Sequence, residues 1–120
     1  PETHHLVDAG FLSGIKAGAY LVNPARGSLV DEAAVAAALA AGHLTGYAAD
    51  TFEMEDWTLD GRPRDIHPAL RDSDKTILTP HIGSAVASVR EAIERSAAES
   101  ILAVRDGVVP ETAVNPDAWR

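Results

Sequence analysis

The stretch AYLVNPARGSLVDEAAVAAALAAGHLTGYAADTF, residues 19–52, contains the pattern that decides the fold. Its ends, AYLVN (19–23) and TGYAADTF (45–52), are short apolar runs, which are typical of strands buried on both faces. The segment between them, SLVDEAAVAAALAAGH (28–43), predicts a helix. A strand, a helix and a second strand in this order indicate a parallel α/β sheet.

The helix expected over residues 28–43 has its own start and stop signals. Asp31 can cap its first turn, Glu32 lies where the helix dipole favours an anion, and Gly42 supplies a left-handed stop. An apolar stripe runs along one face of this helix and consists of Val35, Ala38, Leu39 and Leu44.

The flanking sequence extends the same alternation of strands and helices. Residues 6–15 predict one or two helical turns with Asp8 as N-cap, and TILT (76–79) predicts a third strand. Residues 53–75 predict a polar loop with one turn at 68–72, and residues 84–106 a long amphipathic helix ended by Gly107.

Composition excludes several classes of function. The 120 residues fit one domain, and a net charge of −8 without a Lys/Arg cluster argues against nucleic-acid binding. No apolar run approaches the roughly 20 residues that span a bilayer. The chain has no cysteine, which excludes thiol chemistry and fits the cytoplasm. Because the first residue is Pro1 and not methionine, we expect the chain to be part of a longer protein.

Polar groups follow each of the three predicted strands. The first strand is followed by NPARG (23–27), the second by DTFEME (50–55) and the third by PHIGS (80–84). Ligands bind beyond the carboxyl ends of the strands in a parallel sheet. We therefore expect the cation of Arg26, carboxylates and the imidazole of His81 to converge on one crevice.

Each of these residues also has a purely structural interpretation. Arg26 could be a solvated turn residue, and Asp50 could cap a turn. Glu55 belongs to an acidic loop run, and His81 could be a packing residue at a strand end. For most of these residues taken one at a time, the structural interpretation is favoured. Their occurrence together at the ends of three strands favours a binding or catalytic site.

Other patterns that carry chemistry are absent from the sequence. The histidines lack metal-ligand spacing and no HExxH occurs, so no metal is expected. No serine lies in a GxSxG elbow, which argues against a hydrolase. The chain also contains no GxGxxG dinucleotide-binding motif.

Three motifs together resemble the D-isomer-specific 2-hydroxyacid dehydrogenases: AGAYLVNPARGSLVDEAAVAAAL, YAADTFEMED and LTPHIGSA, in this order. The likeness runs from about Thr3 to Gly107. It implies an α/β fold, the second half of a Rossmann-type doubly wound parallel sheet, with about three strands and flanking helices. Residues 1–107 would form this half of the NAD-binding domain, and residues 108–120 would lead back toward the substrate domain.

Within this family, DEAAV, FEMEDW and TPHIGSAV resemble phosphite (phosphonate) dehydrogenase. The likeness implies an NAD-dependent oxidoreductase that takes a hydride from a small oxyanion, phosphite being favoured. Two positions depart from the pattern: Asp56 stands where most relatives have proline, and Ala25 where the phosphite enzyme has cysteine. A D-2-hydroxyacid dehydrogenase of the hydroxypyruvate/glyoxylate or phosphoglycerate type, an NAD-sensing binding protein and a degenerate fragment stay open as alternatives.

The resemblance also implies roles for individual residues. Arg26 would grip the anionic substrate, His81 would be the catalytic histidine, and Glu55 would pair with it. The implied cofactor-binding residues are Pro24, Ala25, Arg26, Asp50, His81, Ile82, Gly83 and Ser84, with Asp50 at the nicotinamide carboxamide. The implied substrate-binding residues are Arg26, His81, Ser84 and Arg90.

The chemistry of these residue types fits those roles. Arginine offers a planar, permanently charged donor fork for a small oxyanion. Histidine can exchange a proton near neutral pH, and a carboxylate on its other ring nitrogen fixes the tautomer and stabilises the imidazolium.

The first half of the cofactor domain would hold the phosphate-binding loop and the residue that reads the ribose. NAD is therefore expected as the family default, with NADP left open. A three-stranded half-sheet would leave an apolar edge and faces uncovered, so we expect the fragment alone to be marginally folded and inactive. The resemblance implies that the full-length protein is a homodimer that acts on a small anion, and we expect it in the cytoplasm. The acidic charge and the lack of a long apolar run predict no nucleic-acid or membrane partner.

Overall fold

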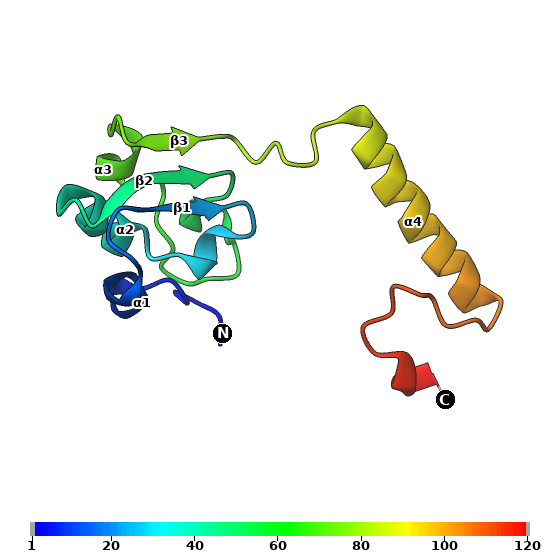
Figure 1. Ribbon diagram of the computed structural model, residues 1–120. Helices are drawn as coiled ribbons and strands as arrows, with labels where there is room; N and C mark the ends of the chain where they lie inside the picture. Colours follow the sequence, from blue (N-terminus) through cyan, green and yellow to red (C-terminus); the bar gives the residue numbers. More distant parts are fainter. Residues whose placement is uncertain (1, 120) are drawn as a thin grey trace. The chain divides into compact units, whose positions relative to one another are not determined.

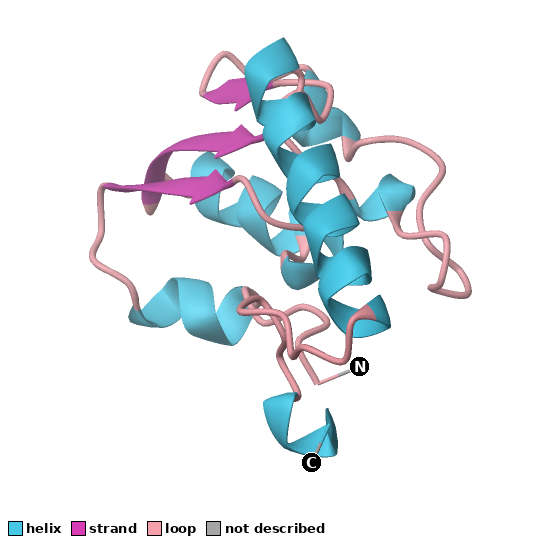
Figure 2. Cartoon of the chain, turned by 90° about the vertical axis from the view of Figure 1, so that its right-hand side faces the viewer, coloured by secondary structure: helices cyan, strands magenta, loops and turns pink. Residues whose placement is uncertain are grey.

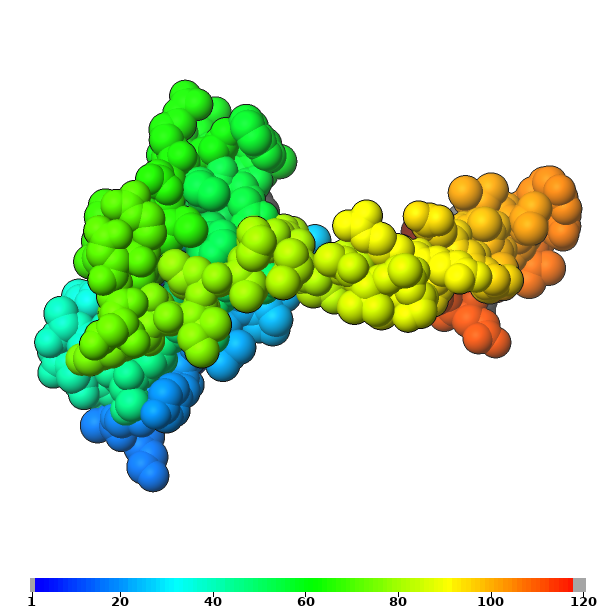
Figure 3. Space-filling view, turned by 90° about the horizontal axis from the view of Figure 1, so that it is seen from above, coloured from blue at the N-terminus to red at the C-terminus, as the bar shows by residue number. Residues whose placement is uncertain are grey.

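A computed structural model describes residues 2–119, and side-chain surroundings up to residue 117. The first residue of the predicted segment 1–107, Pro1, and the last residue of the predicted segment 108–120, Arg120, lie outside the described residues. The chain forms two compact units, one ending at Ile82 and one beginning at Gly83, and each is described by itself. Figure 3 colours the surface of the first unit blue to yellow-green and that of the second yellow to red.

The N-terminal unit is built on a sheet of three parallel strands (Figures 1 and 2). These are β1 (Ala19–Asn23), β2 (Leu44–Ala49) and β3 (Thr76–Leu78), with β2 in the centre. Asn23 pairs with Ala49, and Ala49 pairs with Leu78, so the three carboxyl ends are level. The predicted parallel α/β sheet is confirmed.

Two capped helices precede β1 and β2. Helix α1 (Ala9–Gly14) begins after Asp8, whose Oδ1 accepts a hydrogen bond from Phe11 N at 2.8 Å. Helix α2 (Glu32–Ala40) begins after Asp31, whose Oδ1 accepts from Ala34 N at 3.0 Å. Both N-caps agree with the prediction.

Helix α2 starts four residues later than the sequence pattern predicts. Asp31 is extended, and the preceding residues form a 3₁₀ turn, η1 (Gly27–Leu29), followed by an isolated bridge from Val30 to Val7. A capping residue has non-helical backbone angles, so the helix cannot extend through Asp31. Gly42, at φ +71°, ends this segment as expected.

The core of the N-terminal unit lies between α2 and one face of the sheet. Val35 and Leu39 from α2 are buried with Leu44 and Tyr47 from β2. Leu70, from the short helix α3 (Pro68–Arg71), is also fully buried. Val35 and Leu39 of the predicted apolar stripe therefore face the core, whereas the assignment of Leu44 to this helix is wrong, because α2 ends at Ala40 and Leu44 is the first residue of β2.

The opposite face of the sheet is open within this unit. Tyr20 and Val22 of β1 are 74% and 64% exposed, and Ile77 of β3 is 70% exposed. These positions are not buried on both faces as their apolar runs indicate, and the exposure agrees with the expectation that half of a doubly wound sheet leaves a face uncovered. The described N-terminal unit places its helices against one face, and side chains alternate between the faces of a strand.

The C-terminal unit contains helix α4 (Ala87–Arg105) and a terminal 3₁₀ turn, η3 (Pro116–Trp119). Helix α4 starts three residues later than predicted, because Val86 is extended, and Gly107 follows its end at φ +74°. None of the α4 side chains is buried, and the predicted apolar stripe is exposed, including Ile93 and Ile101. Among the described residues, no helix combines the length and apolarity needed to cross a membrane.

Candidate active site

The loop after β1 is shaped by a buried asparagine. Asn23 is 5% exposed; its Nδ2 donates to the Arg26 carbonyl at 2.9 Å, and its Oδ1 accepts from Ala25 N at 3.1 Å. Asparagine commonly holds a tight turn by bonding to nearby backbone in this way. The turn leaves the side chain of Arg26 exposed at the end of the sheet. The sequence pattern gave no sign that Asn23 has this role.

The same loop packs directly against the loop that follows β2. A Cβ atom at Gly27 would lie 1.9 Å from the carbonyl carbon of Phe52 and 2.3 Å from Glu53 N. Only a residue without a side chain permits this approach of the two backbones. Gly27 therefore sets the spacing between the loop of Arg26 and the loop of Glu55.

Asp50 ties the loop after β2 to the loop after β3. Its Oδ1 accepts from Thr79 Oγ1 at 2.6 Å and from Ile82 N at 2.9 Å. These bonds flank His81, which has a left-handed backbone at φ +54°. Such a conformation is uncommon for a residue with a side chain and is often found at functional sites.

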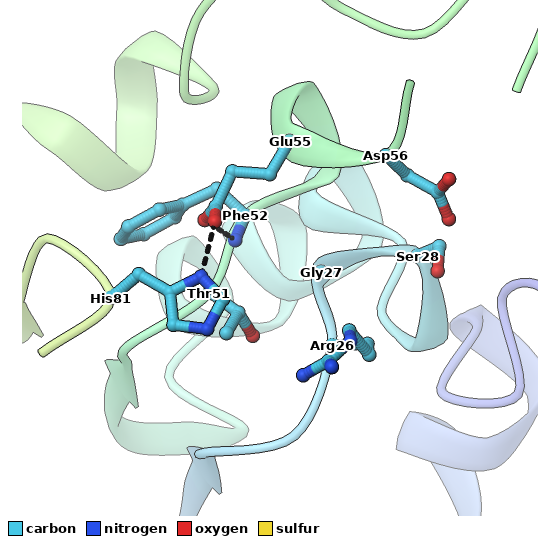
Figure 4. A pocket seen from close by; sticks show the side chains of 8 residues that line it. All are labelled: Arg26, Gly27, Ser28, Thr51, Phe52, Glu55, Asp56 and His81. Atoms are coloured by element: carbon cyan, nitrogen blue, oxygen red, sulfur yellow. Dashed lines mark hydrogen bonds and ion pairs between the residues drawn. The ribbon is translucent and has the colours of Figure 1, made fainter. Parts of the chain in front are cut away.

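Glu55 and His81 form a close pair. Glu55 Oε2 and His81 Nδ1 lie 2.6 Å apart, and Glu55 Oε1 accepts from Phe52 N at 2.7 Å (Figure 4). The carboxylate is thus held by its own turn, η2 (Glu53–Glu55), while it orients the imidazole. Because Glu55 engages Nδ1, proton exchange with a ligand falls to Nε2. The His81 side chain is 47% exposed, which leaves the ring accessible.

These groups surround a pocket of about 210 Å³. Its lining residues come from all three strand-end loops and are Arg26, Gly27, Ser28, Thr51, Phe52, Glu55, Asp56 and His81. Figure 4 shows the imidazole of His81 beneath Glu55 and the guanidinium of Arg26 from the neighbouring loop. The predicted convergence of Arg26, Glu55 and His81 is therefore present within one unit of the chain.

Asp56 adds a negative charge to the pocket wall. Asp56 Oδ1 accepts from Thr58 Oγ1 at 2.6 Å and from Thr58 N at 3.2 Å, and the donors of Thr58, the hydroxyl first, lower the pKa of the Asp56 carboxyl. A carboxylate here disfavours ligands with a second negative charge near it.

A buried polar group lies beneath the site. Glu32 is 3% exposed and accepts hydrogen bonds from Glu53 N at 3.1 Å and His67 N at 2.8 Å. Burial, followed by the charge of Glu32, raises the pKa of Tyr47 to about 12. The sequence pattern indicated Glu32 only as a partner of the helix dipole, because its two donors are distant in the sequence.

The other predicted site residues fall into two groups. Pro24, Ala25 and Ile82 lie on the strand-end loops of the N-terminal unit. Gly83, Ser84 and Arg90 lie in the C-terminal unit, where Arg90 Nε donates to the Ser84 carbonyl at 3.2 Å. Their position with respect to the pocket stays a prediction.

A second depression, of about 120 Å³, lies at the ends of the strands. Its lining residues are Val22, Asn23, Pro24, Ala48, Ala49, Asp50, Ile77 and Thr79. A mostly apolar surface with a carboxylate at one side suits a flat aromatic ring that carries an amide group. These residues therefore fit the nicotinamide that the family resemblance implies.

The fold also brings together three groups that could ligate a metal: His4, His5 and Glu53. Glu53 already pairs with His5. The two imidazoles stack with their centroids 3.9 Å apart, and one ligand atom of each of the three residues lies within 4.8 Å of the others. Exposed acidic and imidazole groups commonly gather in this way without a metal, and the pairing of His5 with Glu53 already accounts for two of the three. We assign no metal to this cluster.

Comparison with known families decides the classification. Residues 1–83 match the family model described as "D-isomer specific 2-hydroxyacid dehydrogenase, NAD binding domain". The chain belongs to this family. The predicted half of a Rossmann-type sheet is therefore confirmed, as is the nicotinamide dinucleotide as the cofactor class.

Three relatives illustrate the extent of the likeness. The glyoxylate reductase of Thermococcus onnurineus is 38% identical over 114 residues, which are 95% of this chain and 32% of that protein. The glyoxylate reductase of Thermofilum pendens is 37% identical over 119 residues, which are 99% of this chain and 33% of that protein. The chain thus spans about a third of the length of these curated relatives.

The third relative is a solved structure, the D-isomer specific 2-hydroxyacid dehydrogenase of Xanthobacter autotrophicus Py2 in complex with NADPH and MES. It has 32% sequence identity and a TM-score of 0.72. The match covers all of this chain (100%) and 46% of that one.

Proposed function

We propose that the protein containing this chain is a nicotinamide-dependent oxidoreductase that interconverts a small 2-oxo acid and its 2-hydroxy acid, of the glyoxylate or hydroxypyruvate type. The observation that carries the proposal is the grouping of Arg26 with the Glu55–His81 pair around one pocket. Both curated relatives described above are named glyoxylate reductase, which supports this substrate class.

The bound nicotinamide would supply or accept the hydride, and the residues of this chain would do the rest. Arg26 would hold the substrate carboxylate with its donor fork. During oxidation, His81 Nε2 would accept the hydroxyl proton, and during reduction it would return that proton to the carbonyl oxygen. Glu55 would stabilise the imidazolium that forms.

The residues that would hold the nicotinamide lie at the strand ends. Asp50 would accept a hydrogen bond from the carboxamide, and Pro24 and Ala25 would line the ring. NAD and NADP both fit the proposal, since the Xanthobacter relative was solved with NADPH. Cytoplasmic location and a homodimer stay predictions for the full-length protein.

Phosphite is the second candidate substrate. The likeness of FEMEDW (52–57) and TPHIGSAV (79–86) to phosphite dehydrogenase supports it. The same groups would serve: Arg26 for the oxyanion and His81 for the proton of the attacking water. The names of the relatives favour the oxo acid.

A substrate panel tests the proposal. The full-length protein would be assayed for the absorbance of reduced nicotinamide with glyoxylate, hydroxypyruvate, 3-phosphoglycerate and phosphite, using NAD(H) and NADP(H). We expect turnover of glyoxylate or hydroxypyruvate to exceed that of 3-phosphoglycerate, because Asp56 lines the pocket. Phosphite-dependent reduction with no oxo-acid activity would favour the second candidate. Cofactor binding without any turnover would instead indicate a dinucleotide-sensing binding protein.

A further inference from the structure

Glu32 connects three parts of the N-terminal unit. It is the first residue of α2 and is almost completely buried, with 3% of its surface exposed. Its Oε1 accepts from Glu53 N at 3.1 Å, and its Oε2 accepts from His67 N at 2.8 Å. These donors stand at the two ends of the loop of residues 53–67. A carboxylate has two acceptor oxygens, so each of these N–H groups has an oxygen of its own, whereas the amide of a glutamine would offer only one oxygen.

The bond to Glu53 acts directly on the catalytic pair. Glu53 is the first residue of η2 and Glu55 the last. Within this turn Glu55 Oε1 accepts from Phe52 N, which leaves Oε2 aimed at His81 Nδ1. Anchoring the Glu53 amide to α2 therefore fixes the turn from which Glu55 reaches the imidazole.

The same bond also sets the distance to the Arg26 loop. Gly27 packs against the backbone of Phe52 and Glu53, so any shift of η2 changes this contact. Glu32 follows the Arg26 loop along the chain and holds η2 on the other side. The carboxylate thus joins the two walls of the pocket.

Capping of α2 does not explain Glu32. The first turn of the helix is capped by Asp31, whose Oδ1 bonds to Ala34 N. Packing alone does not explain it either, since an apolar side chain would leave two inward-facing N–H groups without an acceptor.

We propose that Glu32 is a positioning residue, which holds the Glu55–His81 pair in place through the backbone of η2. The proposal rests on the proposed function for its kinetic consequence. The geometric consequence, the fixed tautomer of His81, is independent of the substrate.

The test uses the full-length protein with Glu32→Ala, Glu32→Gln and, as a matched control, Asp31→Ala. Asp31→Ala weakens the same helix end without touching η2. Long-range ¹H–¹⁵N spectra of the histidine rings, taken where the rings are neutral and assigned with His81→Asn, report which nitrogen of His81 carries the proton. The turnover number and the KM of the cofactor are measured alongside.

We expect wild type and Asp31→Ala to hold the proton on Nδ1, opposite Glu55. In Glu32→Ala the other tautomer should gain population, and turnover should fall about 10- to 100-fold with an unchanged cofactor KM, as a displacement of catalytic groups produces. Glu32→Gln keeps one acceptor and should give a partial rescue. If Glu32→Ala does not fold, Glu32→Gln carries the test with the same expected direction.

Unchanged tautomers in the folded Glu32 variants would overturn the proposal. Equal turnover losses in Glu32→Ala and Asp31→Ala would also overturn it, because helix stability would then explain the effect. If the wild-type protein has no turnover, the proposed function fails, whereas the tautomer measurement still decides the role of Glu32.

Discussion

At the scale of single residues, the two oxygens of Glu55 have separate tasks. One closes the turn by accepting from Phe52 N, and the other faces His81 Nδ1 at 2.6 Å. A carboxylate held by its own backbone loses little further freedom when it orients the imidazole. His81 is in turn held by the flanking bonds to Asp50. The pair is therefore preorganised before any ligand binds.

Replacing His81 by alanine tests its proposed role. We expect His81→Ala to reduce turnover in the full-length protein about 10²- to 10⁴-fold, since that is what a general acid–base group contributes. The dissociation constant of the cofactor, measured by fluorescence titration, should change little. A variant that keeps near-normal turnover would refute the assignment. His43→Ala, on the loop after α2 and outside the pocket, is the matched control.

At the scale of elements, the site depends on how closely the strand-end loops approach one another. The level carboxyl ends of β1, β2 and β3 bring these loops to one edge of the sheet. Gly27 then allows the first loop to touch the second. The sequence pattern located the strands, but it contained no sign that Gly27 meets Phe52.

A methyl group at Gly27 should separate these loops. A Cβ would lie 1.9 Å from the Phe52 carbonyl carbon, and overpacking of this kind costs about 1–3 kcal/mol. We expect Gly27→Ala to lower the free energy of unfolding by this amount in urea denaturation and to raise the KM of the substrate. Gly14→Ala is the control, because nothing lies within 4 Å of the position that its methyl group would take. Equal stability of the two variants would contradict the close approach.

Tyr47, in the strand β2, makes the stability of the folded protein sensitive to alkaline pH. Burial and the nearby charge of Glu32 raise the pKa of Tyr47 to about 12 in the folded state, against about 10 when unfolded. The folded state therefore holds this proton more tightly. The protonated Tyr47 hydroxyl contributes fully to the free energy of unfolding below pH 10. This contribution, about 3 kcal/mol in all, is lost as the pH rises toward 12.

Urea denaturation of the wild type and of Tyr47→Phe between pH 8 and about 11 measures this effect. The wild type should lose more stability than the variant as the pH rises above 10, since phenylalanine cannot ionise. The slopes of stability against pH are compared, so that any effect of removing the hydroxyl that is the same at every pH drops out. Parallel slopes would show that Tyr47 does not carry the effect.

At the scale of the whole molecule, the chain matches only part of the length of its relatives. It spans about a third of its curated relatives, and one face of its sheet exposes Tyr20, Val22 and Ile77. Apolar side chains grouped on an open sheet face are typical of a surface that another segment covers.

We therefore predict that these 120 residues alone do not catalyse dehydrogenation. The isolated chain should bind a hydrophobic dye and give no change in nicotinamide absorbance with glyoxylate or phosphite. Full-length protein prepared in parallel is the control. Measurable turnover by the isolated chain would contradict this expectation.

The sequence by itself determined the order and direction of the elements. Alternating apolar runs and capped helices predicted the three parallel strands, and the N-caps Asp8 and Asp31 were read from local spacing alone. It also indicated Arg26, Glu55 and His81, because strand ends on the same edge must lie together. All of these depend on short-range patterns and on the geometry of parallel sheets.

Only the tertiary structure decided what holds that site in shape. The carboxylate of Glu32 finds its donors 21 and 35 residues away, and Gly27 meets the distant loop at Phe52. The tertiary structure also identified which face of the sheet is open in this unit, the face that carries Tyr20, Val22 and Ile77. The physical reason is that burial and hydrogen-bond partners depend on segments that are distant in the chain, whereas caps and periodicity depend on neighbouring residues.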